Sequence, residues 1–145
     1  MILFCDTSAL VKLNVDEPGG AAMAAAARAA AALAVCRLTW VEMMSALARR
    51  AREQTAGAGA VAIARQRFAR DWSSLMVVEV TQPLMELAGD YTEALALRAY
   101  DSVQLAALLT LRRQAEGEVR FACFDTRLAK AAGVLGAVAL PVLPG

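Results

Sequence analysis

Short apolar segments alternate with longer helical segments along the whole chain, and this alternation is what most restricts the fold. Segments that are mostly apolar over a few residues are typical of strands buried on both faces of a parallel sheet. The sequence therefore predicts an α/β fold in which helices cover both faces of a parallel sheet of four or five strands. The predicted strands are residues 2–5, 34–38, 75–80, 119–124 and 138–140.

Helical segments separate these strands. The Pro-Gly-Gly sequence at residues 18–20 breaks the chain, and the Thr-Trp-Val-Glu sequence at residues 39–42 matches the capping box that opens many helices. Residues 54–59 are polar and glycine-rich, which predicts a loop. The length of 145 residues fits one domain, residues 1–145. The predicted helices are residues 21–31, 39–53, 61–72, 83–96, 100–114 and a short one that ends at residue 132.

The chain contains no histidine, and this absence excludes several kinds of catalytic site. A Ser-His-Asp triad, a Cys-His pair and a histidine-ligated zinc ion are all impossible. Hydrophobic residues make up 59% of the chain, which excludes a disordered protein. Because 15 Lys and Arg residues balance 14 Asp and Glu residues, nucleic-acid binding would need a local basic patch.

The sequence predicts neither a membrane segment nor a signal peptide. Arg28 interrupts the alanine-rich stretch 21–34, and the uncharged stretch 131–145 is shorter than the ~20 apolar residues that a span needs. The three cysteines lack the close paired spacing of a thiolate metal site. We therefore expect a cytoplasmic protein that does not bind membranes and has reduced core thiols at Cys5, Cys36 and Cys123.

Four acidic residues fall where one edge of the predicted sheet would gather them. Asp6 and Asp125 each directly follow a predicted strand, and Glu42 lies four residues after another. Asp101 opens the helix before the strand at 119–124, and this helix starts at the same edge because it must run antiparallel to the strands. The carboxyl ends of parallel strands form a crevice in which ligands bind. The sequence therefore predicts an acidic crevice at this edge.

Asp101 carries a second signal, because it shares a helical stripe with Leu105 and Leu108 in a nearly apolar helix. An acid on the core side of a buried helix is costly unless it is neutral, paired or bound to a cation. The sequence around Asp101 therefore predicts an acid in one of these three states.

Each acid also has a purely structural explanation. Asp6 and Asp125 could be helix N-caps, and Asp101 could interact with a helix dipole. Glu42 could be the glutamate of the capping box. Capping does not require the four acids to share one edge, however, and four carboxylates in one crevice need a counter-charge that no lysine or histidine cluster supplies. Their oxygens suit Mg²⁺ or Mn²⁺, which can activate water and stabilise an in-line displacement at phosphorus.

Four segments of the chain carry a resemblance to a known family. They read MILFCDTSALVKLNVDEPG (residues 1–19), LTWVEMMSALAR (38–49), LRAYDSVQLAAL (97–108) and FACFDTRLAKAAGVLG (121–136). In this order they resemble the PIN-domain ribonucleases, of the VapC toxin class in bacterial toxin–antitoxin pairs. The resemblance implies a Rossmann-like α/β/α sandwich, dependence on Mg²⁺ or Mn²⁺, endonucleolytic cleavage of RNA and a cognate antitoxin as partner.

The resemblance also assigns roles to single positions. Two positions depart from the family's pattern: Cys123 stands where Thr or Ser is frequent, which weakens an expected hydrogen bond, and Asn14 replaces a residue that is often aromatic. Neither departure removes a metal ligand, so we expect an active enzyme. The implied catalytic and metal-binding acids, and the implied hydroxyl near the metal, are Asp6, Glu42, Asp101 and Asp125, and Ser8.

Two groups of arginines could line the crevice and hold phosphates, or could form a solvated surface. Arg98 could pair with an acid of the site or with a phosphate, and the sequence leaves both open. Thr7 is expected only as a cap or strand-end residue. The two groups are Arg49, Arg50 and Arg52 on one helix, and Arg65, Arg67 and Arg70 on the next.

One further set of residues follows helical spacing: Trp40, Met43, Met44 and Leu47. We expect these side chains in the core or at a dimer interface rather than as a stacking platform for RNA. The sequence thereby predicts a homodimer.

The sequence thus predicts a metal-dependent endoribonuclease, the toxin of a toxin–antitoxin pair, in which a metal-activated water hydrolyses RNA phosphodiester bonds. Its predicted partners are a cognate antitoxin and the RNA substrate. A catalytically silent metal- or RNA-binding regulatory module of the same fold is the alternative. A phospho-receiver is disfavoured because no lysine follows Lys130, and an Asp-x-Asp phosphatase because Ser8 stands two residues after Asp6.

Overall fold

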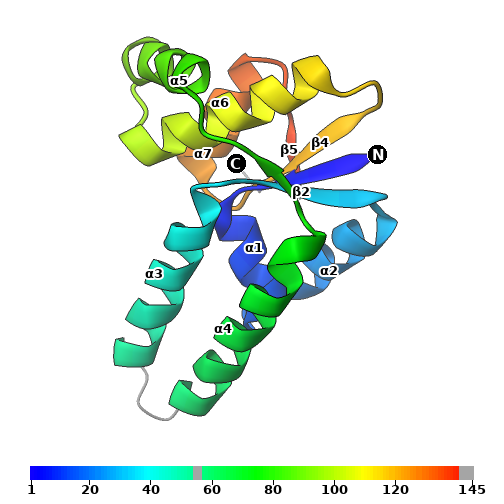
Figure 1. The fold of residues 1–145 in the computed structure, drawn as a ribbon, viewed down its shortest axis with the longest axis vertical. Coiled ribbons are helices and arrows are strands. Elements are labelled where there is room, and N and C mark those ends of the chain that lie inside the picture. Colours follow the sequence, from blue (N-terminus) through cyan, green and yellow to red (C-terminus); the bar gives the residue numbers. More distant parts are fainter. Residues whose placement is uncertain (54–56, 141–145) are drawn as a thin grey trace.

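The computed structural model describes residues 1–53 and 57–140, and at its centre is a five-stranded sheet in which every strand pair is parallel (Figure 1). The strand order is β3-β2-β1-β4-β5, so the first strand lies in the middle and the winding direction reverses between β1 and β4. The predicted α/β class and parallel sheet are confirmed. The strands are β1 (Ile2–Cys5), β2 (Ala32–Cys36), β3 (Met76–Val78), β4 (Val119–Ala122) and β5 (Ala139–Leu140).

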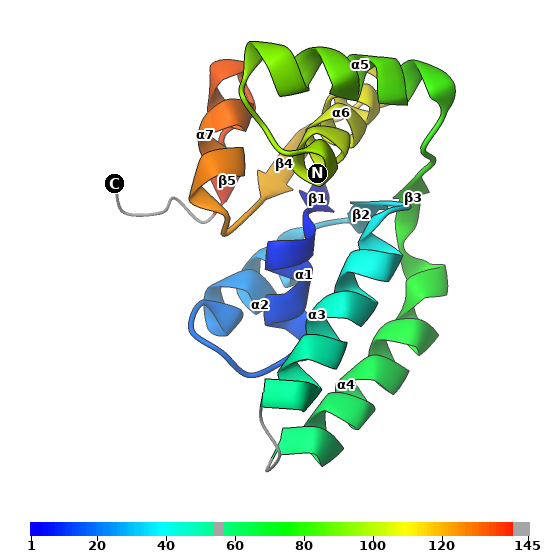
Figure 2. The ribbon, with the colours of Figure 1, turned by 90° about the vertical axis from the view of Figure 1, so that its left-hand side faces the viewer.

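Helices cover both faces of the sheet and give the molecule three layers (Figures 1 and 2). One layer holds α1 (Thr7–Asn14), α2 (Gly20–Ala29), α3 (Thr39–Glu53) and α4 (Ala58–Asp71). The opposite layer holds α5 (Gln82–Ala94), α6 (Ala99–Gln114) and α7 (Thr126–Val134), and a short 3₁₀ turn, η2 (Trp72–Ser74), leads into β3. Within the described ranges, the helices are all too short or too polar to cross a membrane.

The central strand shows why both faces are covered. Successive side chains of a strand point to opposite faces, and all of those from Leu3 to Cys5 are apolar and fully buried. Leu3 and Cys5 pack in one buried cluster with Met43 of α3. Phe4 packs in a second cluster with Leu105 of α6. An apolar strand of this kind leaves no face for water, so it is stable only between two helical layers.

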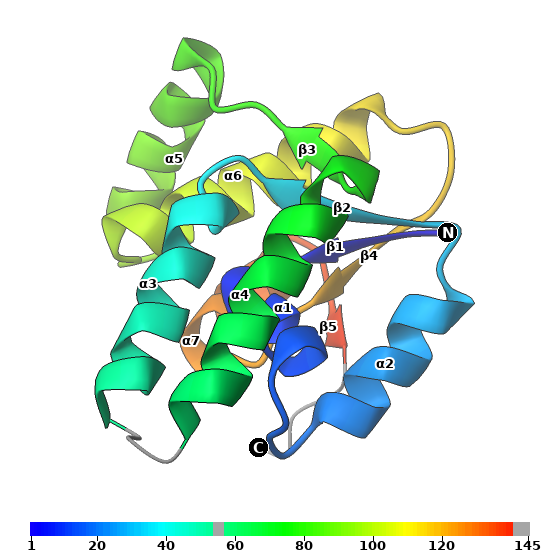
Figure 3. The ribbon, with the colours of Figure 1, turned by 60° about the horizontal axis from the view of Figure 1, so that its bottom comes forward.

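The long helices α3 and α4 lie side by side below the sheet (Figures 2 and 3), and aromatic rings pack between their ends nearest the sheet. The ring of Trp40 lies 5.3 Å from that of Phe68 and 5.2 Å from that of Trp72, measured between centroids. Met43 and Leu47 are buried in the adjoining core. The predicted core role is therefore correct for Met43 and Leu47, and Met43 has no free surface to offer a second copy.

Several predicted boundaries differ from the structure. Asp6 was considered as a helix N-cap, but no range is predicted for helix α1, because eight residues are too few to show a helical period clearly. The strand predicted at 34–38 lies at Ala32–Cys36, since the chain turns toward α3 immediately after Cys36. Of the loop predicted at 54–59, residues 54–56 lie outside the described residues, and Gly59 belongs to α4. Residues 141–145 of the uncharged C-terminal stretch also lie outside them.

Candidate active site

The four predicted acids lie at the carboxyl edge of the sheet, next to the point where its winding direction reverses. Asp6 directly follows β1, and Asp125 follows β4 after two intervening residues. Asp101 lies in the first turn of α6 and Glu42 in the first turn of α3. In parallel α/β sheets this reversal point is where ligands bind. We call these four residues the acidic cluster.

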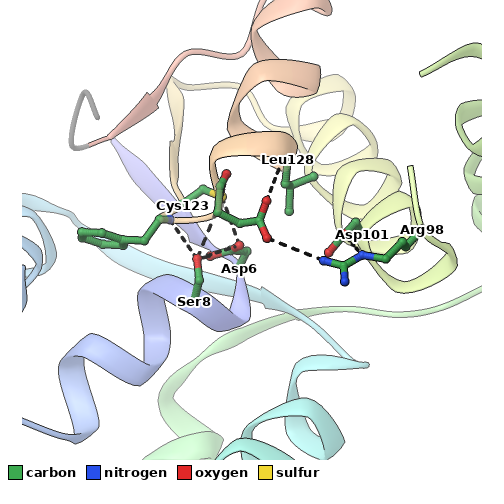
Figure 4. Close-up of polar contacts among 8 residues, drawn as sticks. Asp6, Ser8, Arg98, Asp101, Cys123 and Leu128 are labelled. Atoms are coloured by element: carbon green, nitrogen blue, oxygen red, sulfur yellow. Dashed lines mark hydrogen bonds and ion pairs between the residues drawn. The ribbon is translucent and has the colours of Figure 1, made fainter. Parts of the chain in front are cut away.

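Asp6 is the most buried member of the acidic cluster, with 3% of its surface exposed. Its carboxylate caps α1 by accepting a hydrogen bond from the Ala9 amide (2.9 Å), and it accepts two more from Ser8 Oγ (2.7 Å) and Cys123 Sγ (3.1 Å), as Figure 4 shows in part. The capping explanation is therefore correct for Asp6, but capping accounts for only one of its three contacts. Burial raises the pKa of Asp6 from 3.8 to about 6, and hydrogen bonds from Ser8, Ala9 and Cys123 oppose that rise.

Ser8 joins the ends of the two central strands. Its hydroxyl donates to Asp6 and accepts a hydrogen bond of 2.8 Å from the amide of Phe124, two residues after β4. The structure therefore places this predicted hydroxyl beside the buried carboxylate.

Cys123 occupies the position where the family often has Thr or Ser, and its thiol still reaches Asp6. Burial strongly raises the pKa of this thiol, and the Asp6 carboxylate adds to the rise. The thiol therefore stays protonated and acts as a weak donor to Asp6. A Thr or Ser hydroxyl would be the stronger donor, so the expected weakening at this position has a structural basis.

Glu42 is held by side chains that the sequence analysis did not assign to the site. Its Oε1 accepts hydrogen bonds from Thr7 Oγ1 (2.9 Å) and Gln104 Nε2 (2.7 Å). Gln104 is 2% exposed and also donates to Thr39 Oγ1 at 2.9 Å. The capping-box explanation for Glu42 is wrong, because its carboxylate accepts from these side chains instead of the helix backbone. The expectation that Thr7 is only a cap or strand-end residue is also wrong.

Burial raises the pKa of Glu42, the hydrogen bonds from Gln104 and Thr7 oppose this, and the nearby Asp101 carboxylate adds a small rise. One sequence signal could have identified Gln104. It is a lone amide within an apolar helical run, three residues after Asp101 and therefore on the same face.

Asp101 and Asp125 share one cation, the guanidinium of Arg98, which Figure 4 shows beside Asp101. Arg98 Nε lies 3.3 Å from Asp101 Oδ2, and Arg98 Nη2 lies 3.9 Å from Asp125 Oδ2. Asp125 also caps α7 by accepting from the Leu128 amide at 2.9 Å, so the capping explanation is correct for this residue too. Of the two roles left open for Arg98, the structure shows the contact with acids.

Three neighbouring hollows along the acidic cluster share lining residues, and we call them together the groove. The first, of about 500 Å³, includes Ser8, Asp125, Arg49 and Arg50 in its lining. The second, of about 400 Å³, shares Arg49 with the first and is also lined by Glu42 and Tyr100. The third, also of about 400 Å³, is lined by Glu42, Tyr100, Arg98, Ala99 and Asp101.

The six helical arginines differ in whether they line the groove. Arg49 and Arg50 line it, whereas Arg67 lines a different hollow and donates to the carbonyl of Asn14. Arg50 is paired with Glu17 at 2.8 Å. Arg52, Arg65 and Arg70 line none of these hollows. The prediction of a basic lining therefore applies to two of the six.

The donor chemistry of the acidic cluster fits Mg²⁺ or Mn²⁺, although the side chains are not gathered into a closed site. Within residues 1–53 and 57–140, no three Asp, Glu or Cys side chains converge closely enough to hold a metal ion. Asp6 and Glu42 are nevertheless carboxylates whose partners in that part of the chain are all neutral donors. Buried carboxylates without a cation are costly, and hard oxygen donors are the preferred ligands of these ions.

This geometry defines a class of protein: a three-layer α/β fold with an acidic groove at the reversal point of its sheet. A model of the PIN domain family matches residues 3–134, and the chain belongs to that family. The resemblance noted in the sequence is thereby confirmed.

Two curated relatives come from Mycobacterium tuberculosis: Ribonuclease VapC45 of strain CDC 1551 / Oshkosh and Ribonuclease VapC49 of strain ATCC 25618 / H37Rv. Each is 32% identical to this chain over 110 residues, which is 76% of this chain and 76% of the relative.

Two solved structures share the fold. A chain of a toxin–antitoxin complex from Klebsiella pneumoniae has a TM-score of 0.69 at 20% identity, covering 96% of this chain and 97% of its own. PAE2754 from Pyrobaculum aerophilum has a TM-score of 0.67 at 21% identity, covering 97% of this chain and 84% of its own. At such identities the two structures show the shared fold and nothing further about this chain.

The raised pKa of Asp6 predicts a pH-dependent stability that one substitution should remove. A carboxyl whose pKa is higher in the folded state favours folding when protonated, so the free energy of unfolding should fall as pH rises from about 4 to about 6. For a shift of this size the loss is about 3 kcal/mol. Asp6→Asn stays neutral and can still cap α1, so most of this loss should be absent. Urea unfolding in EDTA, at several pH values between about 4 and 7, measures the difference.

Asp90→Asn is the matched control, because Asp90 is exposed on α5 and lines none of the three hollows of the groove. The same pH dependence in wild type and Asp6→Asn would contradict the assignment of Asp6 as the buried titrating group.

Proposed function

We propose that this chain is a Mg²⁺- or Mn²⁺-dependent endoribonuclease that acts as the toxin of a toxin–antitoxin pair. The observation that carries the proposal is a pair of carboxylates at the sheet edge of a PIN domain, the buried Asp6 and the groove-lining Glu42, whose hydrogen-bond partners within the described residues are all neutral. The names of the curated relatives, both ribonucleases of the VapC series, support the activity. The Klebsiella pneumoniae complex supports an antitoxin partner.

In this proposal Asp6, Glu42 and Asp101 hold the main ion, and Asp125 binds it directly or through a water molecule. When bound, such an ion supplies positive charge at the reacting phosphate and lowers the pKa of water. A carboxylate of the cluster accepts the proton of the attacking water. Because water rather than the RNA 2′-hydroxyl is the nucleophile, the products carry a 5′-phosphate and a 3′-hydroxyl.

The remaining residues of the site have positioning roles in this proposal. Ser8 and Cys123 orient Asp6, while Thr7 and Gln104 orient Glu42, through the hydrogen bonds described above. Holding the carboxylates in fixed positions before substrate arrives reduces the reorganisation needed during the reaction.

Cleavage of RNA should require Mg²⁺ or Mn²⁺ and should stop in excess EDTA. Asp6→Asn and Asp101→Asn should each lower the cleavage rate by more than ~100-fold, because each removes charge that holds the ion at the phosphate. The measurement is single-turnover cleavage of total RNA by purified protein, with Asp90→Asn as the control acid.

Undiminished cleavage in EDTA, or variant rates within a few-fold of wild type, would show that the site is assigned wrongly. Metal-dependent RNA binding without any cleavage would instead favour the alternative, a catalytically silent regulatory module of the same fold.

Arg49 should hold a phosphate of the RNA. It lines two of the three hollows, and its side chain has no hydrogen bond or ion pair within the described residues, unlike that of Arg50. Arg49→Gln should weaken RNA binding regardless of sequence and should reduce the slope of log affinity against log salt by about 0.7. Arg52→Gln is the control on the same helix, and fluorescence anisotropy with labelled single-stranded RNA is the measurement. Equal effects of the two substitutions would exclude a specific contact at Arg49.

The proposed partners are an antitoxin and a second copy of this chain. Since Met43 is buried, contacts between copies must use other side chains, and Val41 and Tyr100 are 57% and 63% exposed beside the groove. Co-expression with the product of a small neighbouring reading frame should give a complex that co-purifies and restores growth. Light scattering of the isolated toxin should give the mass of a dimer. Undiminished toxicity in the presence of the neighbouring gene's product would contradict the antitoxin. A monomer at high concentration would contradict the dimer.

A further inference from the structure

Arg98 is the one cation that contacts the acidic cluster within residues 1–53 and 57–140. We propose that Arg98 is a resident counter-ion: its guanidinium holds Asp101 and Asp125 in the metal-free protein, competes with a divalent cation for them, and binds an RNA phosphate when released. This inference rests on the proposed function. It adds a residue whose anionic partner changes from the two carboxylates to an RNA phosphate.

The competition follows from which carboxylate oxygens are engaged. Oδ1 of Asp125 accepts the Leu128 amide hydrogen, so Oδ2 is the less engaged oxygen, and Oδ2 is the atom that faces Arg98. Arg98 also contacts Oδ2 of Asp101. A divalent cation on these two oxygens would lie against the guanidinium, and like charges at that distance repel. The two modes of binding therefore compete for these oxygens.

Release of the guanidinium is inexpensive because Arg98 is held mainly at its backbone. Its side chain is 71% exposed, so it can move without uncovering a buried surface, and exposed ion pairs contribute little stability. Its backbone is fixed as the residue before α6, where it accepts the Ser102 amide hydrogen at 3.0 Å. The backbone of Arg98 therefore stays in place while its guanidinium moves.

A released guanidinium would remain in the groove. Arg98 lines the same hollow as Glu42, Tyr100 and Asp101, the part of the groove that contains two of the four acids. The planar fork of a guanidinium matches phosphate oxygens as well as it matches carboxylates. An RNA phosphate that enters this hollow would bind the guanidinium of Arg98 and replace Asp101 and Asp125 as its anionic partner.

Arg98→Met should change two affinities in opposite directions, which a purely structural role would not do. Without RNA, the variant should bind Mn²⁺ about three- to tenfold more tightly than wild type, because the competing exposed ion pairs are gone. The readout is the Mn²⁺ concentration dependence of the thermal unfolding temperature, since a ligand that binds only the folded state stabilises it. In EDTA alone the variant should be less stable than wild type, because Asp101 and Asp125 lose their counter-ion.

At saturating Mn²⁺ the same variant should bind RNA more weakly. Its KM for a short single-stranded RNA should rise, and the slope of log(1/KM) against log salt should fall by about 0.7, the value expected for one lost phosphate contact. Arg127→Met is the matched control. Arg127 is exposed near Asp125 on α7, and it has no ion pair within the described ranges, so its removal changes the net charge alone.

Unchanged or weaker Mn²⁺ binding by Arg98→Met overturns the competition, and an unchanged salt slope overturns the phosphate contact. Equal behaviour of Arg127→Met shows an effect of net charge and overturns both. A wild-type protein that gains no stability from Mn²⁺ overturns the proposed function, and this inference with it. If Mn²⁺ stabilises wild type and Arg98→Met equally, at the same Mn²⁺ concentrations, this inference alone is overturned and the proposed function stands.

Discussion

The buried carboxylate of Asp6, at the end of the central strand, is the constraint around which the site is organised. Its oxygens accept hydrogen bonds from Ala9, Ser8 and Cys123, which come from α1 and from the segment after β4. These donors stabilise the carboxylate, but they are neutral and do not compensate its charge. Burial consequently raises its pKa to about 6. A fold that buries an acid in this way leaves a place where a cation is favourable.

The reversal of winding between β1 and β4 brings the other acids to the same edge of the sheet as this carboxylate. Adjacent parallel strands end at the same edge, so Asp6 and Asp125 lie near each other although 119 positions, from 6 to 125, separate them in sequence. Helix α6 begins at the same edge and contributes Asp101 and Gln104, while α3 contributes Glu42. The topology therefore gathers these residues without any local sequence pattern linking them.

The sequence could predict the sheet because its strands are buried on both faces and read as apolar runs such as Ile2–Cys5. It could not predict α1, since eight residues carry too little periodicity, nor the early end of β2, which depends on the turn into α3. The capping box failed for a different reason. Residues 39–42 match the sequence pattern of a capping box, but the carboxylate of Glu42 accepts hydrogen bonds from Thr7 and Gln104, which are distant in the chain.

The acids of the site could be located from the sequence because each stands at a strand end or a helix start. The partners of Glu42 could not, because they depend on long-range contacts: Thr7 is 35 residues from Glu42, and Gln104 is 62 residues from it. Ser8 and Cys123, the partners of Asp6, were expected only from the family resemblance, since Cys123 is 117 residues from Asp6. Arg98 differs in being three residues from Asp101, so a local pairing was foreseeable, whereas its contact with Asp125 was not.

The polar residues of α6 show what this arrangement costs the fold. Ser102 Oγ and Gln104 Oε1 are buried without a hydrogen-bond partner within the described residues, in a helix whose other inward residues are apolar. An unpaired buried polar atom destabilises a protein, and a leucine at Gln104 would suit the surrounding core better. The amide of Gln104 nevertheless donates to both Glu42 and Thr39, and no apolar residue could orient Glu42 in this way. Local departures from good packing concentrate at functional sites. The two apolar clusters on either side of the sheet supply the stability that allows α6 to carry them.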